Sequence, residues 1–110
     1  MGRNSKDHSL TRYEELLKIS VQYSNYKQTS SNSLLLSRAE RKYQKLANEY
    51  MRSVKRTLNK LNKSDKHLIK KEFFSSNRNP FWWTSEYSKS AYYRHRSSAV
   101  KSFLENFEPC

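Results

Sequence analysis

Cysteine, glycine and proline are scarce in this 110-residue sequence, and each shortage excludes a class of protein. The single cysteine, Cys110, allows neither an intrachain disulfide framework nor a cysteine-based zinc site. The single glycine, Gly2, excludes the glycine-rich loops that cradle phosphates in nucleotide-binding enzymes. One glycine and two prolines supply too few turns for a β-sandwich or barrel, so the composition favours long helices.

Long apolar runs and the marks of an active site are also missing. The longest apolar runs, 34–36 and 81–83, are too short to span a bilayer, and the polar N-terminus lacks a signal-peptide core. We therefore expect a cytoplasmic protein with no membrane partner. No paired carboxylates, no metal-ligand spacing of the histidines and no serine with a base are recognisable. The sequence predicts a binding protein rather than an enzyme, with no cofactor and no metal.

Positive charge and aromatic side chains are abundant. The chain holds 22 Lys and Arg against 10 Asp and Glu, a formal net charge of +12, and 14% of its residues are aromatic. The aromatic content argues against disorder throughout, while a hydrophobic content of only 35% limits the core. This length suits a single domain over 1–110.

The positive charge is concentrated in the middle of the chain. Between Arg38 and Lys71 there are 12 basic and three acidic residues, a local net charge of +9. Such a cluster is the electrostatic signature of a protein that binds a phosphate backbone or another acidic partner. A solvated helix face that keeps the protein in solution is the alternative.

The spacing of apolar residues predicts an all-α fold of four to five helices. A first helix begins near Ser9 and ends before the polar segment 28–33. The clearest helix spans about 36–61, where Ser37 and Glu40 form a capping box and a cationic face lies opposite the apolar one. The apolar positions of this long basic amphipathic helix are Leu36, Ala39, Tyr43, Leu46, Ala47, Tyr50, Met51, Val54, Leu58 and Leu61.

The single domain divides into an N-terminal helical hairpin, 1–63, and a C-terminal helix-turn-helix unit, 64–108. The helices of the C-terminal unit are predicted at about 65–74, 81–86 and 88–107, with Ser64 or Asp65 capping the first. The aromatic cluster 81–83 is expected to fill the core with one tryptophan partly exposed; stacking on unpaired bases is the alternative.

The last of these helices carries the residue types of a recognition helix. Small or basic residues at its start let the backbone approach a groove and bind a phosphate, and Tyr92, Ala99 and Phe103 fix the helix from behind. The residues expected to contact nucleic acid are Ser88, Lys89, Ser90, Tyr93, Arg94, Arg96 and Lys101. The lysines expected to hold further phosphates are Lys63, Lys66, Lys70 and Lys71.

The stretch 87–100, YSKSAYYRHRSSAV, resembles the recognition helix of ArpU-type phage transcriptional regulators and is similar to region four of bacterial sigma factors. The shared features are a small polar start, an aromatic anchor at Tyr92, interspersed arginines and an alanine, Ala99, seven residues after the anchor. The resemblance covers about 64–107, and the chain looks like a small ArpU-like protein of mollicutes. The glycine-containing turn of these families is missing here.

The resemblance implies a DNA-binding transcription regulator whose last helix reads the major groove of double-stranded DNA. Two other functions remain open: a basic protein that binds RNA or the ribosome, and an interaction module that docks on RNA polymerase. A single helix-turn-helix usually needs a partner for adequate affinity, so a homodimer is possible as well.

Overall fold

The computed structural model of the protein describes residues 11–30, 38–75 and 79–108. Within these ranges the chain is all-α, as predicted, with the helices α1 (Arg12–Ser30), α2 (Arg38–Lys60), α3 (Lys63–Ile69) and α4 (Lys89–Asn106). A π-helical turn, η2 (Lys70–Phe74), extends α3, and one turn of 3-10 helix, η3 (Trp82–Ser85), precedes α4. None of the described helices is long and apolar enough to cross a membrane.

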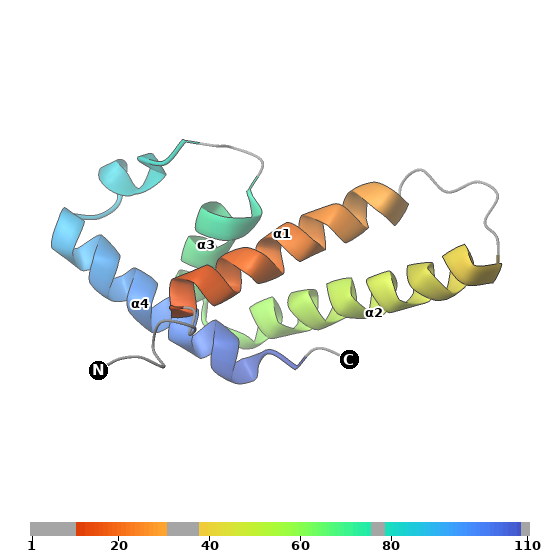
Figure 1. Cartoon of the computed structure of the whole chain (residues 1–110). Helices are drawn as coiled ribbons and strands as arrows, with labels where there is room; N and C mark the ends of the chain where they lie inside the picture. The colour runs from red at the N-terminus through yellow and green to blue at the C-terminus, as the bar shows by residue number, and fades with distance from the viewer. Residues whose placement is uncertain (1–10, 31–37, 76–78, 109–110) are drawn as a thin grey trace, which may run out of the picture.

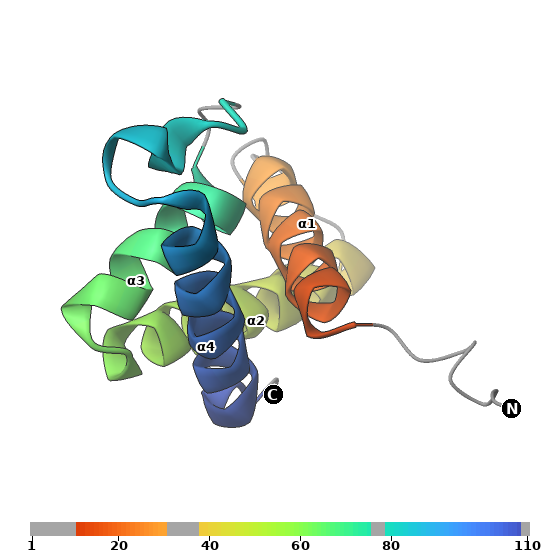
Figure 2. The ribbon, with the colours of Figure 1, turned by 90° about the vertical axis from the view of Figure 1, so that its left-hand side faces the viewer.

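The first two helices form a long antiparallel hairpin, and the remaining elements pack at one end of it. Figure 1 shows α1 running away from α4 and α2 returning beside it, with α3 and α4 at the end where α1 begins. Figure 2, viewed along the hairpin, shows α4 nearest the viewer and the distal ends of α1 and α2 receding behind it. The far end of the hairpin is therefore not covered by α3 or α4.

A capping box begins α1. The backbone N–H of Glu14 donates to Thr11 Oγ1 at 3.1 Å, and the Thr11 N–H donates to Glu14 Oε1 at 3.0 Å. Ser9, the predicted start, lies outside the described residues. The loop predicted from residue 28 is wrong at its beginning, because α1 continues to Ser30. Tyr26 packs edge-on against two aromatic rings of α2, and this tertiary contact outweighs the polar composition of the segment.

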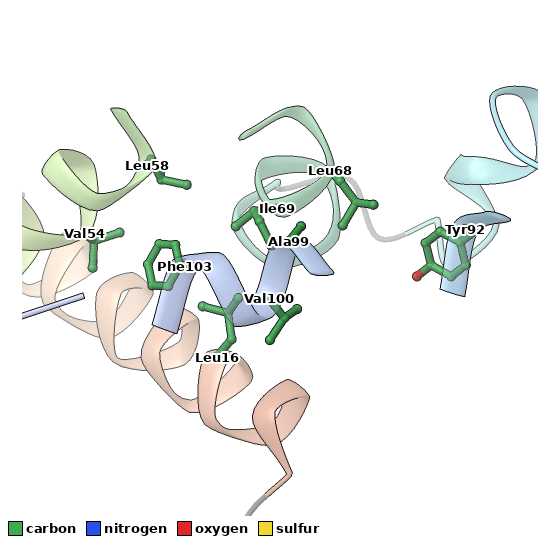
Figure 3. Close-up of a cluster of buried hydrophobic side chains, with 9 residues drawn as sticks. All are labelled: Leu16, Val54, Leu58, Leu68, Ile69, Tyr92, Ala99, Val100 and Phe103. Atoms are coloured by element: carbon green, nitrogen blue, oxygen red, sulfur yellow. The ribbon is translucent and has the colours of Figure 1, made fainter. Parts of the chain in front are cut away.

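The core joins all four helices at the end of the hairpin where α1 begins (Figure 3). Its buried members are Leu16, Val54, Leu58, Leu68, Ile69, Tyr92, Ala99, Val100 and Phe103. The predicted apolar stripe of α2 is confirmed at Ala47, Val54 and Leu58, which are at most 8% exposed. Leu46 is 54% exposed and Tyr43 is 43% exposed, because the far end of the hairpin has no third helix above it. Leu36 and the predicted cap Ser37 lie outside the described residues.

The caps of the two C-terminal helices differ from the expectation. Ser88, expected as about the first residue of the last helix, is the N-cap of α4, and its Oγ accepts a hydrogen bond of 3.3 Å from the Ala91 N–H. The cap of α3 is Asn62 rather than Ser64 or Asp65: Asn62 Oδ1 accepts the Asp65 N–H at 2.7 Å, so α3 begins at Lys63.

The segment predicted as a helix over 81–86 is shorter than expected. It forms only the 3-10 turn η3, and Phe81, which was expected in the core, is 63% exposed. Both tryptophans are half-buried and pack against the core. The expected core position is therefore closer to the truth for the tryptophans than for Phe81. Trp83 stacks on the buried Tyr92 with the ring centroids 4.4 Å apart.

Candidate nucleic-acid interface

The start of α4 is held by a carboxylate that accepts three side-chain hydrogen bonds. Glu72 on η2 accepts from the Tyr13 hydroxyl at 2.9 Å, from Trp82 Nε1 at 2.9 Å and from the Tyr92 hydroxyl at 2.7 Å. One half-buried side chain thereby joins α1, η2, η3 and α4. Burial, followed by the bond to Glu72, raises the pKa of Tyr13 to about 12 and also raises the pKa of Tyr92. Both hydroxyls therefore remain donors at neutral pH.

A second connection fixes the middle of α4 to α3. His95 Nε2 lies 2.8 Å from Asp65 Oδ1, and His95 Nδ1 lies 3.0 Å from the Tyr87 hydroxyl. With the ring proton on Nε2, the histidine donates to the carboxylate and accepts from the tyrosine. Asp65 is only 9% exposed, so this pairing satisfies a buried acid. Sequence reasoning missed the pairing because 30 residues separate its partners.

The outward face of α4 is small, polar and basic. Ser90, Arg94 and Lys101 are exposed and, at intervals of four and seven residues, lie within about 40° of one another around the helix. None of the three makes a hydrogen bond or ion pair with the described part of the chain. Lys89 is exposed at the first turn, and Tyr93 flanks the row and is 45% exposed. We call Lys89, Ser90, Tyr93, Arg94 and Lys101 the α4 face; its side chains are available to a ligand.

Arg96 occupies a different position from the other predicted contact residues. Its guanidinium lies 4.4 Å from the ring centroid of Tyr13, 4.8 Å from that of Tyr93 and 5.5 Å from that of Tyr92. These cation–π contacts join α4 to the beginning of α1. Arg96 is half-buried, and its charge is stabilised within the chain.

The four lysines predicted to hold phosphates do not gather beside the α4 face. Lys66 and Lys70 line a groove between α1, α2, α3 and η2, to which no α4 residue contributes. Lys71 lines another groove, with Leu17 and Trp82, between α1 and η2. Lys63 is exposed at the first position of α3. The predicted set is therefore divided among three places.

The groove that contains Lys66 and Lys70 brings together basic residues from three helices. Its volume is about 320 Å³, and we call it the lysine groove. The lining residues are Tyr23, Lys27, Lys55, Leu58, Asn59, Lys66, Lys70 and Phe74. Sequence reasoning placed Lys55 on the cationic face of α2 but could not bring it together with Lys27, because only the tertiary fold makes them neighbours.

The cationic face of α2 is as predicted. Its eight basic residues are all exposed: Arg38, Arg41, Lys42, Lys45, Arg52, Lys55, Arg56 and Lys60. The helix thus divides into a core-facing side and a strongly positive side.

No profile of a known protein family matches the chain, and neither characterised proteins nor solved structures give a match.

Proposed function

We propose that the protein is a DNA-binding transcriptional regulator whose α4 face enters the major groove. The observation that carries this proposal is the row formed by Ser90, Arg94 and Lys101, which is exposed and without partners in the described chain. A major groove admits one α-helix, and an arginine on such a helix can donate two hydrogen bonds to guanine. The small serine at the first turn lets the helix backbone approach the base edges closely.

The rigid mounting of α4 supports the same function. Its inner side is buried through Tyr92, Ala99, Val100 and Phe103, and Glu72 and Asp65 hold it by hydrogen bonds. A reading helix that is already ordered loses less conformational entropy on binding than a flexible segment does.

The helix-turn-helix assignment belongs to this proposal. It is supported by the packing of α3 against α4 and by the Asp65–His95 contact between them. The helix expected before the turn, 81–86, is only the 3-10 turn η3, which three residues separate from α4, while α3 is the supporting helix. The proposal therefore rests on the α4 face and not on the turn.

Selection of duplexes from a randomised pool tests the α4 face. Wild-type protein should enrich a defined motif, and Arg94→Gln should relax the preference at one or two positions by about 1–3 kcal/mol each. Arg56→Gln, an equal charge loss on the exposed face of α2, should weaken all duplexes alike and leave the motif unchanged. If both variants select the wild-type motif with equal strength, Arg94 is not the reading residue.

Binding of structured RNA is the second candidate, and the cationic face of α2 favours it. Eight exposed basic residues on one helix suit a partner recognised by charge and shape, as double-stranded RNA is. Crosslinking and sequencing of the nucleic acid bound in cells separates the two candidates. Predominant recovery of RNA, with protection centred on α2, would replace the DNA proposal.

A further inference from the structure

The lysine groove is lined by four basic side chains and by no acidic one among the described residues. Lys27, Lys55, Lys66 and Lys70 reach it from α1, α2, α3 and η2, so their convergence is a property of the tertiary fold. Like charges gathered in one groove repel one another, and a bound anion would replace this repulsion with attraction. The arrangement fits a ligand that carries several negative charges.

The two walls of the groove are matched pairs on neighbouring helices. Lys66 and Lys70 are four residues apart on one wall, and Lys55 and Asn59 are four residues apart on the other. Residues at this spacing lie about 5–6 Å apart at Cβ, on the same side of a helix. Lys66 Nζ donates to Asn59 Oδ1 at 2.8 Å, which connects the walls and orients one ammonium group.

The floor of the groove is largely apolar. Leu58 is 8% exposed, and Tyr23 and Phe74 meet edge-on beside it, with ring centroids 5.5 Å apart. A floor of low dielectric constant beneath the ammonium groups weakens solvent screening and strengthens their attraction for an anion.

The lysine groove and the α4 face belong to different sides of the molecule. The Tyr50–Phe107 ring contact marks the flank of α2 that meets the end of α4. Lys55, five residues after Tyr50, is about 140° around the helix from that flank. No residue of α4 lines the groove, and Figure 2 shows α4 in front of α2. A duplex on the α4 face therefore leaves the groove open.

We propose that the lysine groove binds the phosphate backbone of a second nucleic-acid segment, so that one copy of the chain bridges two segments. The first segment is the duplex of the proposed function, on which this inference rests. A backbone suits the groove better than an isolated phosphate because Lys55 also belongs to the cationic face of α2, where Arg52 and Arg56 continue the positive track. Ammonium groups are point charges, so the second segment is held without regard to its sequence.

A two-duplex capture experiment with the full chain tests the bridge. A duplex with the selected motif is immobilised, protein is added, and retention of a fluorescent duplex of unrelated sequence is measured. The test variant is Lys66→Gln with Lys70→Gln. The matched control is Arg12→Gln with Lys18→Gln, which removes the same charge from exposed positions of α1, outside the groove, the cationic face of α2 and α4. Circular dichroism establishes that both variants are folded.

Wild-type and control proteins should retain the second duplex. The test variant should retain about tenfold less of the second duplex. In a plot of log affinity for the second duplex against log salt concentration, its slope should be smaller in magnitude by about 2. Its affinity for the immobilised motif should match that of the control. The bridge is excluded if the wild-type protein retains no second duplex. It is also excluded if the test variant retains as much second duplex as the control, which is the result expected of a dimer that bridges two duplexes through two α4 faces. Displacement of the second duplex by an equal concentration of tripolyphosphate would also overturn it, because the groove would then serve small polyphosphates.

Failure of the proposed function gives a different pattern from failure of the bridge. If Arg94→Gln with Lys101→Gln leaves capture on the motif unchanged while the Lys66 and Lys70 variant abolishes it, the groove is the sole binding site and α4 does not read DNA. If the α4 variant loses the motif and the groove variant changes nothing, the proposed function stands and the bridge fails.

Discussion

The Tyr92 hydroxyl donates a hydrogen bond of 2.7 Å to the Glu72 carboxylate, joining α4 to a π-helical turn 20 residues earlier in the chain. The same carboxylate accepts hydrogen bonds from α1 and η3. One acidic side chain in a strongly basic protein therefore helps to set the direction of α4, together with the Asp65–His95 contact and the buried inner side of the helix.

Replacement of Glu72 by alanine should lower the free energy of unfolding by about 2–4 kcal/mol, because one buried and two half-buried donors lose a charged acceptor. Urea denaturation followed by circular dichroism measures the change. Glu105→Ala removes an exposed carboxylate from α4 and should change stability by less than about 0.5 kcal/mol. Equal effects of the two substitutions would show that the Glu72 hydrogen bonds contribute nothing.

Alkaline pH should destabilise the fold through Tyr13. Its pKa is raised from 10.0 to about 12 in the folded chain, first by burial and then by the bond to Glu72. The unfolded chain therefore loses this proton first as pH rises, so the stabilisation is complete below pH 10 and declines between about pH 10 and 12. Urea titrations across this pH range should show that the free energy of unfolding declines less steeply in Tyr13→Phe than in Tyr43→Phe, which alters an exposed ring. Parallel declines in both variants would contradict the assignment.

Asp65 and His95 should be energetically coupled. A double-mutant cycle with Asp65→Ala and His95→Ala should give a coupling energy of about 1–3 kcal/mol at neutral pH, because each single change leaves a partly buried polar group unpaired. Equilibrium unfolding of the four proteins supplies the cycle. The His67–Glu86 pair is the control: both side chains are at least 40% exposed, so its coupling should be below about 1 kcal/mol. Strictly additive losses for Asp65 and His95 would mean that their contact is energetically neutral.

Arg94 and Arg96 should affect different properties although they are two residues apart. Arg96→Gln should lower stability by about 1 kcal/mol, because its cation–π contacts with three tyrosines are lost. Arg94→Gln should leave the unfolding transition unchanged, since this exposed side chain has no partner in the described chain. Thermal melts of the two variants under identical conditions provide the comparison; an Arg94 effect on melting as large as that of Arg96 would be contrary to the structure.

Features that depend on local sequence were predicted well. The long apolar repeat of α2 and its opposite cationic face were evident, because a pattern sustained over many turns outweighs individual exceptions. The start of the last helix was predicted to within one residue, because Ser88 directly precedes the helical pattern. The α4 face followed from the same periodicity, although its function remains a prediction.

Features that depend on long-range contact were not predictable. Glu72 and Tyr13 are 59 residues apart, and nothing local distinguishes Glu72 from a solvated acid. The lysine groove has the same origin, because Lys27 and Lys70 become neighbours only when the hairpin closes over α3. The exposure of Leu46 was missed because periodicity identifies the apolar side of a helix and does not tell where its neighbours end.

The uncovered end of the α1–α2 hairpin implies a gradient of local stability along the two helices. Near α4 their backbone amides lie beside the shared core, whereas toward the far end the aromatic contact of Tyr26 with Tyr43 joins them. Amide protons at the far end should therefore exchange with solvent through small openings, while those around Val54 and Leu58 should require global unfolding. The hairpin would then open from its tip while α4 remains in place, so a partner could deform one end of the molecule without disturbing the other.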